Sequence, residues 1–393
     1  MKRSNLTFLL FLIVLSFNGN CQNSIENEND FYQLILGKDT LVDHVLLNDD
    51  YRVQIRYTDI DETNSLNTIA IGEQLYFFPA STVKLIVAAF VLEIVQTKDL
   101  KLSDYIVFNQ DVNCGNSLFV TNSKKKEVSI GEMLEEMLIV SDNNHYNAFF
   151  HFVTPGYMKE RLDEMGLSDV KIFRSFTGCN EIEHLKTNSY SVYRNDSLIT
   201  SFAGSQFDVD EFKSKYTYSE EKRIGAYNMQ GKDIFPGPYN FNHNLELPLD
   251  DLHAILLRIY QPRLFTESQC FKLNEVSLSY LKKQLEAFPS QLRNNKFKDG
   301  NKYPDQLYKY AIIGEGKVLT DSLTLGSKLG LSYGFVTETA YVIDQKHDIE
   351  FALSISIYCN KNKTVNDGIY EYESIARPVI SRISNMLYLN RLK

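Results

Sequence analysis

Ser81 and Lys84 are the residues whose type and spacing most directly indicate chemistry. They lie in the stretch FFPASTVKLIVAAFVLE, residues 77–93, where they open an almost wholly apolar segment. On a helix, residues three apart share a face and their side chains can meet. A lysine desolvated among apolar neighbours has its charged form disfavoured, so its pKa falls and it can accept a proton from a serine hydroxyl. Ser81 is therefore a candidate nucleophile, with Lys84 as its base.

The setting of this pair distinguishes it from the other SxxK patterns of the chain. The pattern occurs five times, at Ser81, Ser123, Ser168, Ser219 and Ser279. Only at Ser81 do aromatic residues and a proline precede the pattern while a long apolar helix follows it. The alternative is that Ser81 merely caps the helix and Lys84 extends along its surface to solvent.

Two later motifs supply further polar groups. The single SDN of the chain, Ser141 to Asn143, lies in IVSDNNHYNAFF, between two segments with helical periodicity. Near the C-terminus, GSKLGLSYGFVTETAYVID places Lys328 and Gly330 at the start of a strand pattern. Each motif also has a structural interpretation: Ser141 and Asp142 could cap a helix, and Lys328 could be a solvated lysine at a strand edge.

SxxK, SDN and a KxG strand, in this order and these settings, resemble the motifs of class A β-lactamase-type and penicillin-binding serine hydrolases. The resemblance extends from about residue 31 to the end of the chain. It implies that Ser81 is acylated, that Lys84 takes its proton, and that Ser141 relays a proton to the leaving nitrogen. The mechanism that this resemblance implies uses no metal or other cofactor.

The resemblance also implies a substrate-binding set, namely Asn143, Gly330 and Leu331. Asn143 would hydrogen-bond Lys84 and the amide of the substrate, while Lys328 would supply positive charge for a substrate carboxylate. The backbone N–H groups of Ser81 and Leu331 would form the oxyanion hole, which is worth about 3 kcal/mol per donor.

Two positions depart from the family pattern. Leu329 stands where the family has a threonine between the strand lysine and glycine, so a hydroxyl that would bind a β-lactam carboxylate is missing; Ser332 is a nearby substitute. The ExxLN pattern of the deacylating glutamate is also absent, because neither Glu181 nor Glu183 in CNEIEHLKTN has its spacing. Without such a base the acyl-enzyme would hydrolyse slowly, so turnover is expected to be weak.

The periodicities predict an α/β fold. Alternating residues predict strands in 51–60, 66–78, 331–344 and 349–359, whereas helical patterns dominate between them, including 129–139, 143–153 and 249–260. The expectation is an antiparallel sheet built from both chain ends (31–80 and 320–393), flanked by helices such as the closing one in 372–390, plus an all-α lobe over about 81–319. Residues 186–241 are Tyr-, Ser- and Asn-rich and are interpreted as an insertion on that lobe.

The N-terminus predicts export. Lys2 and Arg3 precede a short apolar run, typical of a signal peptide over residues 1–20, with a retained anchoring helix as the alternative. Cys21 is a candidate lipidation site, residues 21–30 a polar tether, and residues 31–393 the folded domain. Cell envelope or periplasm is thus the expected location, with membrane contact only through the lipid.

The net charge and the spacing of the cysteine and histidine residues limit the kinds of partner that the sequence predicts. Without residues 1–20 the chain has 39 basic and 50 acidic residues, a net charge of −11 that disfavours nucleic acid. Cys114, Cys179, Cys270 and Cys359 show no zinc spacing and are left unassigned between disulfides and free thiols. His145 and His151 are six apart, on different helix faces, so no metal site is predicted.

Two functions remain after these considerations. The first is a serine hydrolase that cleaves an amide, either a β-lactam or a peptidoglycan-type peptide, through an acyl-Ser81 intermediate. The second is a non-catalytic envelope lipoprotein that uses the same fold to bind cell-wall peptides or a protein partner.

Overall fold

The computed structural model describes residues 25, 27–60, 66–109, 111–112, 128–179, 181–208, 222–242 and 244–393; for residues 181 and 182 it describes the backbone only. The predicted signal peptide and Cys21 lie outside the described residues. Helix α1 begins at Glu28, with Ile25 buried before it, so regular structure begins slightly earlier than residue 31.

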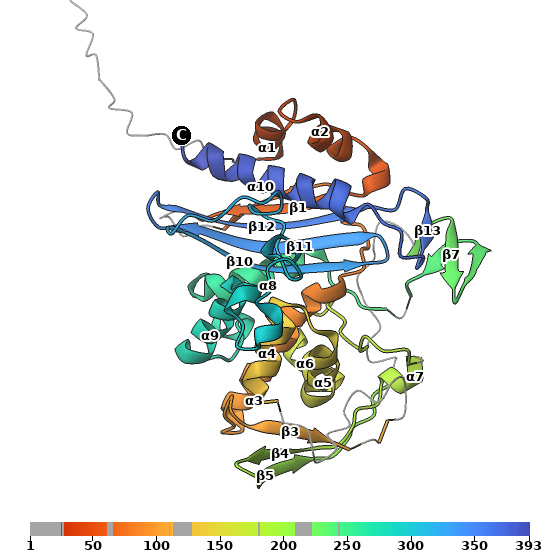
Figure 1. Ribbon diagram of the computed structural model, residues 1–393, viewed down its shortest axis with the longest axis vertical. Helices are drawn as coiled ribbons and strands as arrows, with labels where there is room; N and C mark the ends of the chain where they lie inside the picture. The colour runs from red at the N-terminus through yellow and green to blue at the C-terminus, as the bar shows by residue number, and fades with distance from the viewer. Residues whose placement is uncertain are drawn as a thin grey trace, which may run out of the picture.

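A five-stranded antiparallel sheet joins the two ends of the chain, as predicted (Figure 1). Its order is β10-β11-β12-β1-β2, with β1 paired to β12 and β10 on one edge. The strands are β1 (Gln54–Asp59), β2 (Asn67–Ile71), β10 (Leu323–Ser332), β11 (Phe335–Asp344) and β12 (Ile349–Tyr358). The predicted α/β class is therefore confirmed.

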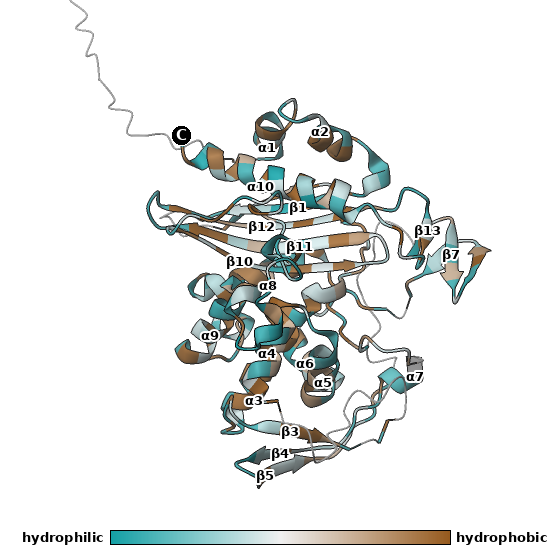
Figure 2. Ribbon diagram, viewed as in Figure 1, coloured by the Kyte–Doolittle hydropathy of each residue, from teal (hydrophilic) through white to brown (hydrophobic). Residues whose placement is uncertain are grey.

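Each face of the sheet packs against helices, because residues of opposite parity along the strands point to opposite sides. One face is covered by α1 (Glu28–Ile35), α2 (Thr40–Leu46) and α10 (Arg377–Arg391), the last preceded by a π-helical turn, Tyr372–Ala376 (Figure 1). The sheet lies between these helices and the lobe, and its strands carry many hydrophobic residues (Figure 2). Leu325, Leu329 and Phe351 belong to the core on the α10 side.

The other face packs on the helical lobe through α8. The helices of this part are α3 (Val83–Thr97), α4 (Ile130–Ile139), α5 (Asn143–Val153), α6 (Pro155–Glu164), α7 (Glu181–His184), α8 (Leu249–Tyr260) and α9 (Glu275–Glu286). Ser129 and Glu132 form a capping box at the start of α4, and Asp142 caps α5. These caps explain why both helices begin close to their predicted positions.

The lobe is not all-α, contrary to the prediction. A three-stranded sheet of β3 (Tyr105–Phe108), β4 (Tyr190–Arg194) and β5 (Ser197–Phe202) lies at its end (Figure 1). The predicted insertion supplies β4 and β5, and its residues pair in antiparallel register, for example Ser191 with Ser201. Short strands also occur there: β6 (Arg223–Ile224), β7 (Tyr227–Gln230), β8 (Asp233–Pro236) and β9 (Tyr239–Asn240), with β13 (Thr364–Val365) beside β7.

Two of the cysteines left unassigned are free, namely half-buried Cys270 and buried Cys359. Cys179 is disulfide-bonded. Cys114 lies outside the described residues.

Helix α3 is the centre of the lobe. Within the described residues, Ala80–Thr97 is the one helical stretch long and apolar enough to cross a membrane, yet 83% of it is buried inside the protein. It is therefore a core helix here.

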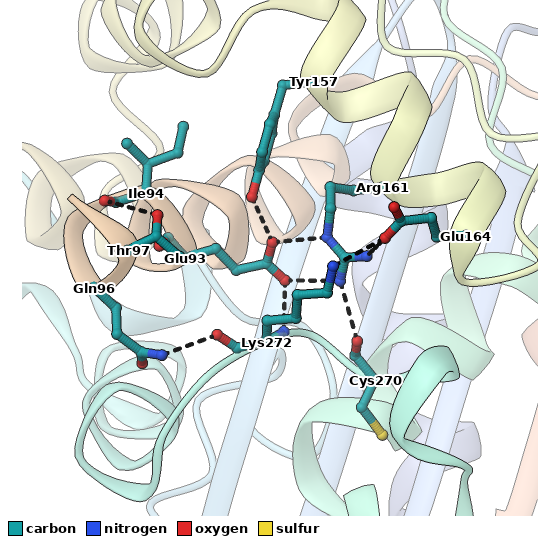
Figure 3. A network of polar contacts seen from close by, with 9 residues as sticks. All are labelled: Glu93, Ile94, Gln96, Thr97, Tyr157, Arg161, Glu164, Cys270 and Lys272. Atoms are coloured by element: carbon teal, nitrogen blue, oxygen red, sulfur yellow. Dashed lines mark hydrogen bonds and ion pairs between the residues drawn. The ribbon is translucent and has the colours of Figure 1, made fainter.

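The charged Glu93 side chain near the C-terminal end of α3 is fully buried and paired (Figure 3). Its carboxylate accepts from Arg161 Nε at 3.0 Å, from the Tyr157 hydroxyl at 2.8 Å and from the backbone N–H of Lys272 at 2.6 Å. Arg161 also donates to the carbonyl of Cys270. This network fixes α3 to α6 and to the segment before α9.

Replacing Glu93 with alanine should lower the free energy of unfolding by about 3 kcal/mol, because it leaves the Arg161 guanidinium buried with fewer partners. The control is Lys159→Ala, which breaks the half-exposed pair of Lys159 and Asp163 on α6 and should cost less than about 0.5 kcal/mol. Urea unfolding of both variants is the measurement. Equal losses would show that the buried network adds no particular stability.

Candidate active site

Ser81 lies in a single 3-10 turn, η2 (Ala80–Thr82), which leads directly into α3. Ala80 has a φ of 46°, so the chain turns sharply just before the serine. The Ser81 side chain is partly exposed, and Thr82 is the residue at the N-cap position of α3. The helix-capping alternative for Ser81 therefore finds no support.

Lys84 is fully buried one turn later, so it does not extend to solvent. Its Nζ atom donates to the Ser141 carbonyl at 2.5 Å, to Asn143 Oδ1 at 2.6 Å and to Ser141 Oγ at 3.1 Å. Burial holds the pKa of Lys84 well below its usual value, and the charge of Lys328 lowers it further, while Asp142 acts in the opposite direction.

Ser141 lies between two lysines. Its Oγ atom is 3.1 Å from Lys84 Nζ and 3.1 Å from Lys328 Nζ. A φ of 59° at Ser141 turns the chain, and the next residue, Asp142, caps α5 by accepting from the N–H groups of Asn144 and His145. Capping is thus carried out by Asp142, and the Ser141 side chain points to the lysines instead.

Lys328 is 3% exposed, so it is not a solvated edge lysine. Its Nζ also donates to the Leu329 carbonyl at 3.1 Å. Burial lowers the pKa of Lys328 to about 7, with Glu338 raising it and Lys309 lowering it. The lysine can therefore exist in either protonation state near neutral pH.

Gly330 allows β10 to approach the serine turn. A Cβ atom at this position would lie 2.6 Å from the Pro79 carbonyl oxygen and 2.9 Å from the Ser81 nitrogen. Any side chain would push the strand away from η2. Gly330 thus determines how closely β10 can pack against the backbone of Ser81.

Strand β10 is an edge strand, and hydrogen bonds from two lysine side chains show which of its backbone groups point away from β11. The carbonyl of Leu325 accepts from Lys309, and the carbonyl of Leu329 accepts from Lys328. Because edge-facing groups recur at every second residue in an antiparallel strand, the N–H of Leu331 should face the same edge, next to Ser81. This is the position that an oxyanion hole made by these two residues requires.

A cavity of about 300 Å³ opens beside Ser81. Its described lining residues are Phe78, Ala80, Ser81, Asn143, Arg174, Ser175, Phe176, Thr177, Asn244, Leu331, Ser332 and Tyr333. Leu329 is not among them, because its side chain is 3% exposed in the core on the α10 side. Ser332, the suggested substitute for the missing hydroxyl, does line the cavity.

The lining set includes residues that the motifs did not indicate. Arg174 and Thr177 come from the segment IFRSFTGC after α6, and Tyr333 comes from the turn between β10 and β11. The Tyr333 ring packs edge-on against Phe78, with centroids 5.0 Å apart, and stacks on Tyr239 at 5.4 Å. Only the charge of Arg174 beside aromatic residues could have indicated this part of the site.

No carboxylate occurs among the described residues that line this cavity. Glu183 is not one of them, and the side chain of Glu181 lies outside the described part of the chain. The described residues thus offer no deacylation base beside Ser81.

Glu136, Asp142 and His145 form the one group of potential metal ligands within the described residues. Glu136 accepts from Asn294 at 2.9 Å, lies 3.2 Å from His145 Nε2, and has Lys296 at 3.7 Å. The positive charge of Lys296 and these hydrogen bonds already balance the Glu136 carboxylate, so the group carries no metal assignment.

Residues 40–390 match the model of the β-lactamase enzyme family, and the chain belongs to that family. Among solved structures, PBP-A is 13% identical, with a TM-score of 0.53 over 92% of this chain and 96% of its own. The TLA-3 extended-spectrum β-lactamase is 13% identical, with a TM-score of 0.52 over 91% and 100% of the two chains. A β-lactamase from Xanthomonas campestris pv. campestris has 13% identity and a TM-score of 0.51 over 92% and 100%. These structures share the fold; no curated protein sequence matches.

Replacing Gly330 with alanine should displace β10 from η2, at a cost of about 1–3 kcal/mol in unfolding free energy. Reaction of Ser81 with an activated acyl donor should slow as well. Gly300→Ala is the control, because a Cβ there has no atom within 4 Å. Calorimetry and intact-mass labelling test the pair, and identical behaviour of the two variants would contradict the close-approach argument.

Proposed function

We propose that this protein is a serine hydrolase that cleaves an amide, in a β-lactam or a peptidoglycan-type peptide, through an acyl-Ser81 intermediate. The observation that carries the proposal is the complete burial of Lys84 with its Nζ atom on Ser141 and Asn143. A lysine held this way favours its neutral form, which is the form a general base requires.

The hydrogen bonds of Lys84 also orient its lone pair. A neutral amine has two N–H donors and one lone pair, and its two closest acceptors, the Ser141 carbonyl and Asn143 Oδ1, can take both donors. The lone pair is then left to accept from a hydroxyl group, either that of Ser141, whose Oγ is 3.1 Å away, or that of Ser81 during its attack. Ser81 lies one turn away on the same face, so its proton passes to Lys84 as Oγ attacks the carbonyl carbon.

Collapse of the tetrahedral intermediate needs a proton on the leaving nitrogen. Ser141 Oγ, in contact with both Lys84 and Lys328, can donate its own proton to that nitrogen and recover one from Lys84. The N–H groups of Ser81 and Leu331 would stabilise the oxyanion. No step requires a metal or cofactor.

Hydrolysis of the acyl-enzyme is the weakest step of this mechanism, because no described lining residue is a carboxylate. We therefore expect slow turnover and a long-lived adduct. Two observations favour the second candidate, a non-catalytic envelope module that binds cell-wall peptides or a protein partner. They are this lack of a carboxylate among the described lining residues and the presence of Leu329 where the family has a threonine. We also propose that the protein is exported and carries a lipid on Cys21. This part of the proposal is supported only by the sequence of residues 1–21.

Replacing Lys84 with arginine should slow acylation of Ser81 by at least about 100-fold, because a guanidinium stays protonated and cannot serve as a base. Labelling by a fluorescent penicillin and by an activated ester, followed by intact mass, measures the rate. Ser81→Ala should abolish the adduct, and circular dichroism checks folding. Unlabelled wild type would favour the binding module, and equal rates for wild type and Lys84→Arg would exclude Lys84 as the base.

The pH dependence of acylation should move in opposite directions in two variants. The rate rises with pH as Lys84 loses its proton. Lys328→Met removes a positive charge that disfavours protonated Lys84, so the pKa of Lys84 rises and the rising limb shifts to higher pH. Asp142→Asn removes a negative charge and keeps a capping side chain, so the limb shifts to lower pH. Rate profiles that superimpose would contradict the assignment of this limb to Lys84.

A further inference from the structure

Arg174 is a cationic residue in the cavity that the mechanism above does not use. Its side chain is half-buried and lines the cavity together with Ser81 and Asn143. Within the described part of the chain, no carboxylate or carbonyl accepts a hydrogen bond from its guanidinium. A guanidinium offers five N–H donors and keeps its charge at any relevant pH, so here it is available to an anionic ligand.

The backbone around Arg174 is held in place by α5. The Tyr146 hydroxyl donates to the Arg174 carbonyl at 3.0 Å, and Asn147 Oδ1 accepts from the Phe176 N–H at 2.7 Å. The Phe176 ring stacks on Tyr146 with centroids 4.3 Å apart. Since α5 begins at Asn143, the position of Arg174 is coupled to the residue expected to bind the substrate amide.

The cavity lies on one side of the serine. Asn143 lines it, whereas neither Ser141 nor Lys328 is among its described lining residues. In the proposed mechanism the leaving nitrogen faces Ser141, so the acyl portion of the substrate extends the other way, into this cavity and towards Arg174.

The same cavity is also lined by the aromatic rings of Phe78 and Tyr333. Burial raises the pKa of Tyr333 to about 12, with the charge of Arg174 acting in the opposite direction. Ser332 and Thr177 add hydroxyl groups to the same cavity. The site thus combines one unpaired cation, short hydroxyl side chains and an aromatic surface, with no described carboxylate to repel an anion.

Resting on the proposed function, we infer that Arg174 selects substrates whose acyl portion bears a carboxylate close to the carbonyl that Ser81 attacks. This class includes a peptide with an acidic group before the scissile amide and an acylamino compound with a carboxylated side chain. Arg174 is a specificity-determining residue in this inference, and it takes no part in proton transfer.

The test uses two penicillins that differ in this one group, carbenicillin, whose acyl side chain carries a carboxylate, and benzylpenicillin, whose side chain does not. Second-order rate constants for adduct formation at Ser81 are measured by intact mass for wild type, Arg174→Gln and Arg174→Lys. Arg223→Gln, an exposed arginine on β6 outside this cavity, is the matched control.

Wild type should prefer carbenicillin, and Arg174→Gln should reduce the carbenicillin-to-benzylpenicillin rate ratio by about 10- to 100-fold, the range expected for a hydrogen bond to a charged group. Arg174→Lys should retain part of the preference, and Arg223→Gln all of it. A ratio that is the same in wild type and Arg174→Gln would overturn this inference while leaving acylation of Ser81 intact. Absence of an adduct with both penicillins, in a protein that an activated ester still labels at Ser81, would also overturn this inference, whereas absence of an adduct with all three reagents would overturn the proposed function.

Discussion

The rest of the site depends on the burial of an amine inside an apolar helix. Lys84 has no access to solvent, so its Nζ atom must find protein acceptors, and Ser141 and Asn143 provide them. This requirement fixes the SDN turn against the start of α3. It also places Ser141 Oγ within reach of Lys328, whose own burial lowers its pKa. Two desolvated lysines then share one hydroxyl, and the charge of Lys328 further lowers the pKa of Lys84.

Strand β10 connects this polar cluster to the sheet. Successive side chains point to opposite faces, so Lys328 and Gly330 face the serine turn while Leu325 and Leu329 enter the core beneath α10. The leucine that departs from the family pattern therefore adds apolar packing on the α10 side. The hydroxyl groups near Ser81 come instead from Ser332 and Thr177, and Arg174 is the cationic side chain among the described residues that line the cavity.

The insertion contributes to the site through aromatic packing. Tyr239 and Phe241 contact the Tyr333 ring, which in turn packs on Phe78 just before the serine turn. One wall of the cavity is thus supported by a segment distant in sequence from every motif. On the other wall, Tyr146 and Asn147 of α5 hold the segment that carries Arg174. Substitutions in either of these two supporting segments are therefore expected to change substrate preference, although they leave Ser81 and Lys84 unchanged.

The sequence by itself determined the class of fold and the chemical groups at the centre of the site. Hydrophobic periodicity predicts local elements, and α5 and α8 occupy their predicted ranges because an N-cap or a proline begins each one. The motifs predicted Ser81, Lys84, Ser141 and Lys328 because their spacing and apolar settings are local properties. Tertiary structure decided the remainder. The sheet of β3, β4 and β5 pairs strands more than eighty residues apart, and a weakly alternating polar segment gives no signal for such a partner. Arg174 and Tyr333 belong to the cavity only because packing brings a loop after α6 and a hairpin turn to the same serine, and contacts between distant segments leave no periodic pattern in the chain.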